Sequence, residues 1–191
     1  MEPENEIFAD YVKGLRACLD ELSGQDVEDI ADVIFNAYKE GKQIFVLGNG
    51  GSATTACHFA RDLQISTAVE GKPRVRTTSL TDNVALVTSL ANDIDYSLIF
   101  KEQLIGQLNE GDVAIGITSS GNSPNILKAM EFARCQGAVI IGLIGFGGGK
   151  LQELTHKSVV LSSQDYGPVE DTHLVLAHLI TYLVRDRIAR D

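Results

Sequence analysis

The residues best suited to chemistry lie between positions 42 and 63, KQIFVLGNGGSATTACHFARDL. An apolar run, Ile44–Leu47, predicts a buried strand, and a glycine-rich turn (residues 48–51, GNGG) follows it directly. Glycine tolerates positive φ angles and lets a ligand come close to the backbone. Ser52 or Thr54 can then cap a helix. Because free N–H groups and the helix dipole point at such a turn, the stretch predicts a site for an anion or a sugar phosphate.

Two side chains on that predicted helix have a spacing suited to chemistry. His58 and Asp62 are four residues apart, so on a helix they share one face. The spacing suits a metal-binding pair or an acid–base pair, although a His near an Asp on a helix is more often an ordinary hydrogen-bonded pair. The GNGGS turn is also weak as a motif, because it lacks the third glycine of GxGxxG and the Gly-Lys-Ser/Thr of a P-loop. Neither feature assigns a function alone.

A second loop, residues 118–123 (TSSGNS), carries four hydroxyl side chains within six residues. It follows a predicted buried strand, Val113–Ile117, and Pro124 suits the first turn of the helix after it. A serine-rich turn with one helix cap would account for one or two of these hydroxyls. Four hydroxyls and a glycine favour phosphate binding, since they donate hydrogen bonds without adding a charge.

The helix predicted for residues 168–190 carries acids and histidines beside an apolar centre. At about 100° per residue, His173 and His178 lie roughly 140° apart, so one site is not expected to use both. Glu170 and His178 are separated by about 80°, which one site could span. We expect His173 to be a surface or hydrogen-bonded residue and His178 to be the functional one.

Strands and helices alternate from residue 42 onward. Near-continuous apolar strands separated by helices predict a parallel sheet covered on both faces, a three-layer α/β sandwich. In such sheets ligands lie at the carboxyl ends of strands, so the GNGG turn and the hydroxyl loop are expected at one edge. Besides the two strands already named, the pattern predicts strands at 75–80, 138–144 and 158–161.

Further helices are expected around this core. Residues 5–22 and 26–40 have apolar side chains at helical spacing, and Gly41 ends the second helix. These helices form an N-terminal extension, residues 1–41, that covers the sheet and could also pack against another subunit. Shorter helices are predicted at 84–90 (interrupted at 91–93), 96–108 and 150–154.

Length and composition describe one ordinary globular domain. The chain has 191 residues, 44% hydrophobic and 22% charged, so we interpret 1–191 as a single domain with its α/β core at 42–191. The net charge of −10, without a block of Lys or Arg, disfavours a nucleic-acid partner. Three widely spaced cysteines form no disulfide framework, the N-terminus lacks signal-peptide features, and no apolar run approaches the ~20 residues of a membrane span. A reduced, cytoplasmic protein with no membrane partner is expected.

Taken together, these motifs resemble the sugar isomerase (SIS) family, and within it the phosphoheptose isomerases. The resemblance rests on LGNGGSATTACHFARDL, LTDN…AND, GITSSGNSPNILKA, GLIGFGGGKL and the ExxH…H of the last helix, and it covers nearly the whole chain. It implies a flavodoxin-like SIS fold and a homotetramer with active sites between subunits. It also implies a zinc enzyme that interconverts sedoheptulose 7-phosphate and D-glycero-D-manno-heptose 7-phosphate.

The same resemblance implies roles for particular residues. The sugar phosphate would contact Asn49, Gly50, Gly51 and Ser52, the sugar would face Asn92 and Asp93, and the phosphate would be held by Thr118, Ser119, Ser120 and Ser123. The metal would be bound by His58, Asp62, Glu170 and His178. Asp62 or Glu170 would act as the general base of an enediol mechanism, and His178 as the acid.

Two of these positions depart from the family's usual His, Glu, Gln, His. Asp62 is one methylene shorter than Glu, so its carboxylate would reach about 1 Å less, and a misplacement of that size can cost ~10²-fold in rate. Glu170 in place of an amide adds a negative charge, which should tighten binding of a divalent cation. Zinc suits this set, though manganese, iron or nickel could also use it. We interpret the two changes as compensatory.

Two other functions stay open. The protein could isomerise another phosphosugar, because the phosphate-binding residues say nothing about the length of the sugar chain. It could also be a non-catalytic SIS protein, a tetrameric adaptor or regulator. Such proteins tend to lose the metal and acid–base residues, which this sequence retains at His58, Asp62, Glu170 and His178.

Overall fold

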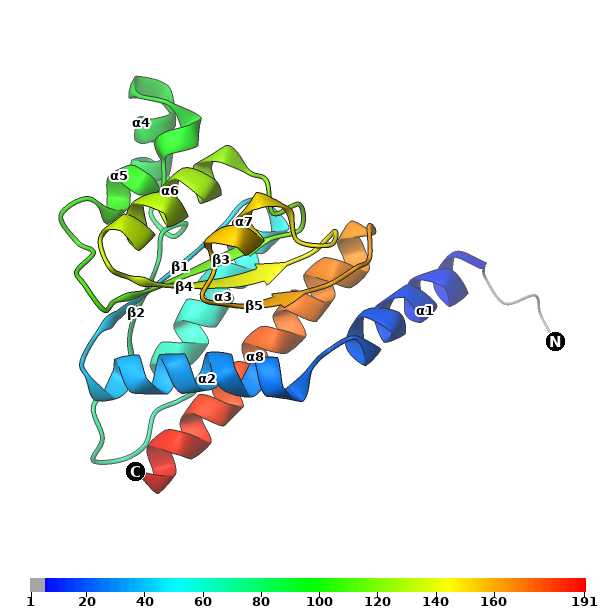
Figure 1. Ribbon diagram of the computed structural model, residues 1–191, viewed down its shortest axis with the longest axis horizontal. Helices are drawn as coiled ribbons and strands as arrows, with labels where there is room; N and C mark the ends of the chain where they lie inside the picture. The colour runs from blue at the N-terminus through cyan, green and yellow to red at the C-terminus, as the bar shows by residue number, and fades with distance from the viewer. Residues whose placement is uncertain (1–5) are drawn as a thin grey trace.

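A five-stranded parallel sheet forms the centre of the protein (Figure 1). The structure is a computed structural model and describes residues 6–191. The strands lie in the order β2-β1-β3-β4-β5, and all neighbouring strands are parallel. This flavodoxin-like order reverses the direction of strand addition between β1 and β3. The strands are β1 (Gln43–Gly48), β2 (Arg76–Ser79), β3 (Val113–Thr118), β4 (Val139–Ile144) and β5 (Lys157–Val160).

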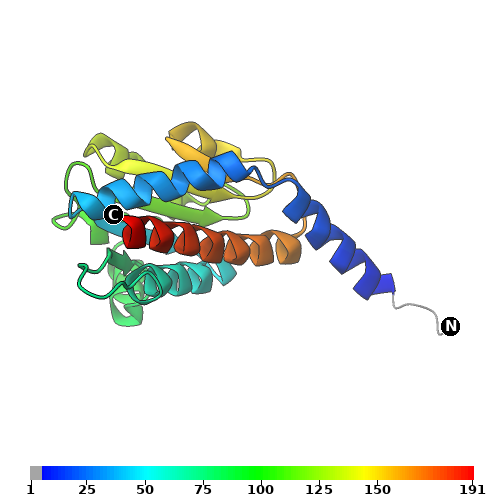
Figure 2. The ribbon, with the colours of Figure 1, turned by 90° about the horizontal axis from the view of Figure 1, so that it is seen from below.

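Helices cover both faces of the sheet, as Figures 1 and 2 show. Along β1, Ile44 and Val46 are buried in one apolar cluster with α2, α3 and α8, whereas Phe45 and Leu47 are buried in another with α5, α6 and α7. This alternation gives each apolar strand residue a helical layer to pack against. It confirms the predicted three-layer α/β sandwich. The helices are α1 (Glu6–Asp20), α2 (Gly24–Lys39), α3 (Gly51–Ile65), α4 (Val84–Asp93), α5 (Lys101–Leu104), α6 (Pro124–Cys135), α7 (Gly149–Leu154) and α8 (Tyr166–Arg190), with a 3₁₀ turn η1 (Tyr96–Leu98).

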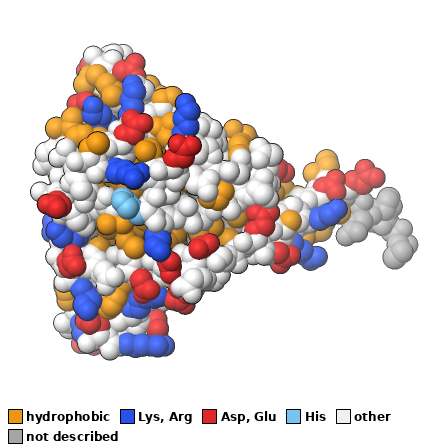
Figure 3. Space-filling view, in the orientation of Figure 1, with side chains coloured by type: hydrophobic (Ala, Val, Ile, Leu, Met, Phe, Trp, Pro, Cys, Tyr) orange, Lys and Arg blue, Asp and Glu red, His pale blue; other side chains and the backbone are white. Residues whose placement is uncertain are grey.

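The two N-terminal helices take different positions. α2 lies against the sheet and buries Ile30 and Ile34 in the cluster shared with α8, whereas α1 projects beyond the sheet (Figures 1 and 2). α1 is fixed to the start of α8, where the Tyr11 hydroxyl donates a hydrogen bond to Asp171 over 2.6 Å. Several of its apolar side chains are exposed, with Phe8 61% accessible, although Cys18 is buried, and Figure 3 shows hydrophobic atoms along this projection. The sheet-covering role predicted for the extension therefore belongs to α2. Residue 5, where the first helix was expected to begin, lies outside the described residues.

The segment between β2 and β3 differs from its prediction. α4 continues through residues 91–93 instead of breaking there, and the chain breaks next at Asp95, which is extended (φ −169°, ψ 137°). The Asp95 carboxylate accepts a hydrogen bond from the Ser97 N–H over 2.7 Å, an alternative to the helical bond for that region. The predicted helix over 96–108 is also wrong. Only η1 and the four-residue α5 form, and Gly106 with φ +81° follows them.

Within residues 6–191, no helix combines the length and the apolar composition that are needed to cross a bilayer.

His173, on α8, is buried in the core. His173 is 1% exposed, and neither ring nitrogen has a hydrogen-bond partner of normal geometry among the described residues. Burial lowers the pKa of His173 to about 4, and the backbone carbonyl of Ile144 opposes this shift only in part. His173 was expected to be a surface or hydrogen-bonded residue. The surface position is wrong, because this face of α8 packs into the core, and of the hydrogen-bonded alternative only the interaction with the Ile144 backbone remains.

We expect this buried ring to make the protein less stable in mild acid. The pKa of His173 is about 4 in the folded protein, whereas histidine in an unfolded chain has a pKa of about 6.5. Between these values the unfolded state binds a proton that the folded state does not, so the free energy of unfolding falls as the pH falls. The loss should reach on the order of 3 kcal/mol, complete below about pH 4. Urea titrations between about pH 7 and about pH 4 measure it.

The control is His173→Leu, which fills the same space without titrating. Its free energy of unfolding should fall less over this range than that of the natural protein. Two curves that run parallel through the whole range would contradict the assignment.

Candidate active site

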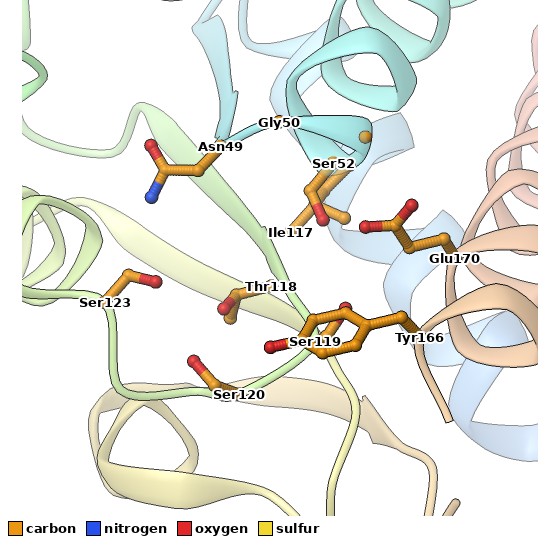
Figure 4. A pocket seen from close by; sticks show the side chains of 11 residues that line it. Asn49, Gly50, Ser52, Ile117, Thr118, Ser119, Ser120, Ser123, Tyr166 and Glu170 are labelled. Carbon is orange, nitrogen blue, oxygen red and sulfur yellow. The ribbon is translucent and has the colours of Figure 1, made fainter. Parts of the chain in front are cut away.

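A pocket of about 280 Å³ opens at the carboxyl edge of the sheet, where β1 and β3 end (Figure 4). The parallel register pairs Gly48 with Ile117, so the loops after these strands leave the sheet side by side. As the sequence predicts, the GNGG turn and the hydroxyl loop meet at one edge. The start of α8 closes the third side. The lining residues are Asn49, Gly50, Gly51, Ser52, Ile117, Thr118, Ser119, Ser120, Ser123, Tyr166 and Glu170.

The turn after β1 brings the bare N-terminus of α3 to this pocket. Gly50 is the N-cap residue with φ +55°, a left-handed value that favours glycine, and no side chain caps the helix. Thr54 instead donates its hydroxyl to the Gly51 carbonyl over 2.6 Å. The expected cap by Ser52 or Thr54 is therefore wrong. No side chain makes a capping hydrogen bond there, so the N–H groups at the positive end of the α3 dipole can bind an anion, beside the Glu170 carboxylate that approaches Gly51.

The hydroxyl loop offers donors that the protein itself does not fully use. The Ser119 hydroxyl is buried and has no hydrogen-bond partner among the described residues, and Ser123 precedes α6 without capping it. Thr118 and Ser120 each accept a bond from a backbone N–H within the loop, at 3.3 and 3.2 Å, and keep their own hydroxyl protons for a ligand. A buried polar group without a partner costs free energy. The loop is thus arranged to donate hydrogen bonds to a ligand in the pocket.

A group of three possible metal ligands lies where α3 and α8 pack together. The His58 Nε2 is 3.0 Å from the Asp62 Oδ2 and 3.0 Å from the His178 Nε2, and the remaining pair is 3.8 Å apart. Within residues 6–191 this is the one cluster of three or more such side chains, all three ligand atoms lying within 4.8 Å of one another. Ligands that each lie about 2 Å from a tetrahedral zinc ion would be about 3–4 Å apart. The two imidazoles and the carboxylate therefore fit such an ion.

Asp62 uses its two oxygens differently. Oδ2 faces the histidines, while Oδ1 accepts hydrogen bonds from Arg61 and from Ser66, the latter over 3.1 Å. Burial raises the pKa of Asp62, but these hydrogen bonds outweigh it and hold the pKa below its usual range. The side chain is therefore an ionised carboxylate, and the hydrogen bonds from Arg61 and Ser66 to Oδ1 orient its Oδ2 toward the histidines. Both histidine side chains are partly exposed.

Glu170 lies in the pocket, apart from this group. It belongs to the first turns of α8 and points at the start of α3 (Figure 4). A Cβ added to Gly51 would come within 2.1 Å of its Oε2, so the close approach requires glycine there. Of the four side chains predicted to bind metal, the structure brings three together and leaves Glu170 at the pocket. Glu170 precedes His178 by eight residues of α8, about 12 Å along the helix axis.

Asn92 and Asp93 do not reach the pocket in this single chain. They are the last residues of α4, they are exposed, and the Asn92 amide donates to the Asp93 carboxylate over 2.8 Å. α4 itself has no buried residue. The two predicted sugar contacts are therefore separated from the other eight substrate-binding positions.

Two residues of the pocket wall, Ile117 and Tyr166, are not among the predicted site residues; Ile117 was expected only as the end of a buried strand. Tyr166 begins α8 and lines the pocket (Figure 4), and its ring packs edge-on against that of Phe146, with centroids 4.8 Å apart. The one available signal is its spacing, because it lies four residues before Glu170 and hence on the same helix face.

Fold and site together define an α/β protein with a pocket lined by hydroxyl and backbone N–H donors at the carboxyl edge of a flavodoxin-like sheet, and with a cluster of three possible metal ligands where α3 and α8 pack together. Residues 8–145 match the family model of the SIS domain, and the chain belongs to the SIS domain family.

Several relatives that are about one third identical to this chain are phosphoheptose isomerases. The chain is 32% identical over 188 residues to the phosphoheptose isomerase of Aquifex aeolicus, which covers 98% of this chain and 97% of that protein. It is 34% identical to that of Aneurinibacillus thermoaerophilus, over 86% of this chain and 83% of that one. The solved structure of a phosphoheptose isomerase from Francisella tularensis matches with a TM-score of 0.88 at 26% identity, covering 95% and 97% of the two chains.

We expect His178→Ala to weaken zinc binding by more than the roughly 10–100-fold that changes behind a metal ligand cost, since it removes a ligand itself. Isothermal titration with Zn²⁺ measures the affinity. His156→Ala is the matched control, because His156 lies outside the metal group and its Nδ1 accepts a hydrogen bond from the Ile140 N–H. Equal affinities in both variants would show that the group does not hold the metal.

Proposed function

We propose that the protein is a phosphosugar isomerase that interconverts sedoheptulose 7-phosphate and D-glycero-D-manno-heptose 7-phosphate. The observation that carries the proposal is the position of the His58–Asp62–His178 group on α3 and α8, the two helices that also frame the hydroxyl-lined pocket. An anionic end of a substrate and a metal-assisted reaction would thus be served by the same pair of helices. Membership in the phosphoheptose isomerase group gives the class of reaction, an aldose–ketose isomerisation.

The phosphate is assigned to the pocket. Backbone N–H groups at the start of α3 and the hydroxyls of Thr118, Ser119, Ser120 and Ser123 would surround it. All of these donors are neutral, so they suit an anion without placing a cation in the site. Binding energy from the phosphate would then position the distant carbons of the sugar.

The residues divide the chemistry between them. Zinc, or another divalent ion held by His58, Asp62 and His178, would supply a Lewis acid that polarises a carbonyl oxygen. We assign the general base to Glu170, because the Asp62 carboxylate is held by Arg61 and Ser66 and its pKa is lowered. Glu170 would take a proton from the carbon beside the carbonyl and return it to the neighbouring carbon. Because His178 lies about 12 Å further along α8, this role requires Glu170 and the metal group to come closer together when substrate binds. His178 is kept as the acid that moves a proton between the two oxygens, a role that requires its Nε2 to be free of the metal at that step.

A homotetramer with active sites between subunits is also proposed. Two features of the single chain support it: α1 projects with exposed apolar side chains, and α4 has no buried residue although it carries Asn92 and Asp93. A second copy could cover α1 and bring these polar residues to a neighbouring pocket. Light scattering that gives the mass of one chain would contradict this.

Two alternative functions stay open. Isomerisation of a different phosphosugar would use the same phosphate donors, and a non-catalytic adaptor or regulator would need neither metal nor base. The intact His58–Asp62–His178 group favours the enzyme over the adaptor, because a binding protein gains nothing from an oriented buried carboxylate beside two histidines.

The test is turnover of sedoheptulose 7-phosphate by metal-free protein and then with Zn²⁺ added. We expect activity to depend on the metal, and Asp62→Ala to lower kcat/KM by about 10²- to 10⁴-fold. Ser119→Ala should mainly raise KM, by about tenfold, because it removes one hydrogen bond to a charged group. The matched controls are Asp186→Ala, exposed on α8, and Ser158→Ala on β5; both should keep wild-type kinetics.

Each outcome selects among the functions. Sugar phosphate that binds without turnover would favour another substrate. Neither binding nor turnover of any C5–C7 phosphosugar would favour the adaptor. Turnover that survives both metal removal and Asp62→Ala would contradict the assigned site.

A further inference from the structure

The side-chain amide of Asn49 is held by two residues that do not line the pocket. Asn49 and Asn125 exchange a reciprocal pair of hydrogen bonds, with the Asn49 Nδ2 2.9 Å from the Asn125 Oδ1 and the Asn125 Nδ2 2.8 Å from the Asn49 Oδ1. Tyr96 adds a third bond from its hydroxyl to the Asn49 Oδ1 over 3.1 Å. Three segments, the turn after β1, η1 and the first turn of α6, therefore meet at one amide.

The direction of each of these bonds is fixed by the backbone. The Ile126 N–H donates to the Asn125 Oδ1 over 3.0 Å, and a backbone N–H can only donate. The atom of Asn125 that faces Ile126 must therefore be the oxygen. It follows that the Asn49 atom nearest to that oxygen is the nitrogen, and that Tyr96 donates to the Asn49 oxygen.

This arrangement leaves the Asn49 side chain able to offer a ligand only a hydrogen-bond donor. Its oxygen accepts two hydrogen bonds, from Asn125 and Tyr96, so both of its lone pairs are used. Its nitrogen has two hydrogens, and one is used by Asn125. Among residues 6–191 no acceptor takes the second. In Figure 4 the Asn49 amide extends away from Glu170, toward the side of the pocket where Ser123 lies.

We propose that Asn125 is a positioning residue that makes Asn49 a dedicated hydrogen-bond donor to an oxygen of the sugar phosphate. The proposal rests on the proposed function for the identity of that ligand. An amide fixed as a donor favours a phosphate or carbonyl oxygen over the hydrogen of a sugar hydroxyl, so Asn125 contributes to the choice of ligand without touching it.

Burial makes Asn125 the stronger of the two partners. Asn125 is 1% exposed, whereas Tyr96 is 56% exposed. A hydrogen bond shielded from water holds its partner more firmly than one that water can replace. Asn125 also follows Ser123 by two residues at the start of α6, which ties the position of Asn49 to that of the hydroxyl loop.

The experiment measures KM and kcat for sedoheptulose 7-phosphate in Asn125→Ala and Tyr96→Phe. We expect Asn125→Ala to raise KM by about tenfold or more and to change kcat much less, because an oriented donor to the bound substrate is lost. Tyr96→Phe should raise KM by about two- to tenfold. Because Tyr96 is exposed, this second variant tests the proposal even if Asn125→Ala folds poorly.

A double-mutant cycle with Asn49→Ala separates positioning from general stability. If Asn125 and Tyr96 act through Asn49, neither variant should raise KM by more than about twofold in the Asn49→Ala background. Asn36→Ala, on α2 outside the pocket, is the matched control and should leave KM unchanged. Unchanged KM in both single variants, or full effects that persist without Asn49, would overturn the proposal.

Failure of the proposed function would be distinguishable. If the natural protein neither binds nor turns over sedoheptulose 7-phosphate, the same variants can be titrated with inorganic phosphate and followed by ³¹P NMR. Weaker phosphate binding in Asn125→Ala that depends on Asn49 would support the positioning role alone. Equal phosphate binding in all variants would overturn it.

Discussion

The site depends on the parallel pairing of β1 with β3. Both strands are buried on both faces, so their apolar residues alternate between two helical layers, and a slip of one residue would turn every side chain toward the wrong layer. The register that pairs Gly48 with Ile117 is therefore strongly determined by the core. It places the bare end of α3 beside the hydroxyl loop. The pocket to which we assign the phosphate is a consequence of how the core packs rather than a feature of either loop alone.

The central sheet and both loops could be predicted because their signals are local. A strand, a glycine turn and a helix follow one another within some twenty residues, and His58 and Asp62 share a helix face by spacing alone. The contact of His178 with this pair joins residues 120 positions apart, so only the packing of α8 on α3 could reveal it. The angle between Glu170 and His178 around the helix predicted that both could serve one site. The distance between them along α8 is about 12 Å, and it places Glu170 at the pocket instead. The break near residue 93 was misplaced because the side chain that competes with the helix is Asp95, two residues further on.

The structure also explains how an acidic protein can hold an anion. The net charge is −10, yet screening limits the reach of exposed charges to about 8–10 Å in salt solution. At the pocket itself the donors are a helix end, four hydroxyl side chains and the fixed amide of Asn49. Over the face of the protein seen in Figure 3, acidic and basic side chains are mixed rather than gathered by sign. Glu170 is the one carboxylate in the pocket wall, which suits a group that exchanges protons with a substrate more than one that binds its phosphate.

The central claim is that α3 and α8 present a metal and a phosphate to the same substrate. A crystal structure of the protein with Zn²⁺ and sedoheptulose 7-phosphate, with anomalous data collected at the zinc edge, tests it most directly. The account predicts an anomalous peak among His58 Nε2, Asp62 Oδ2 and His178 Nε2, and phosphate density against Ser119 with the sugar extending past Glu170. Zinc bound elsewhere, or a phosphate outside the pocket, would contradict it.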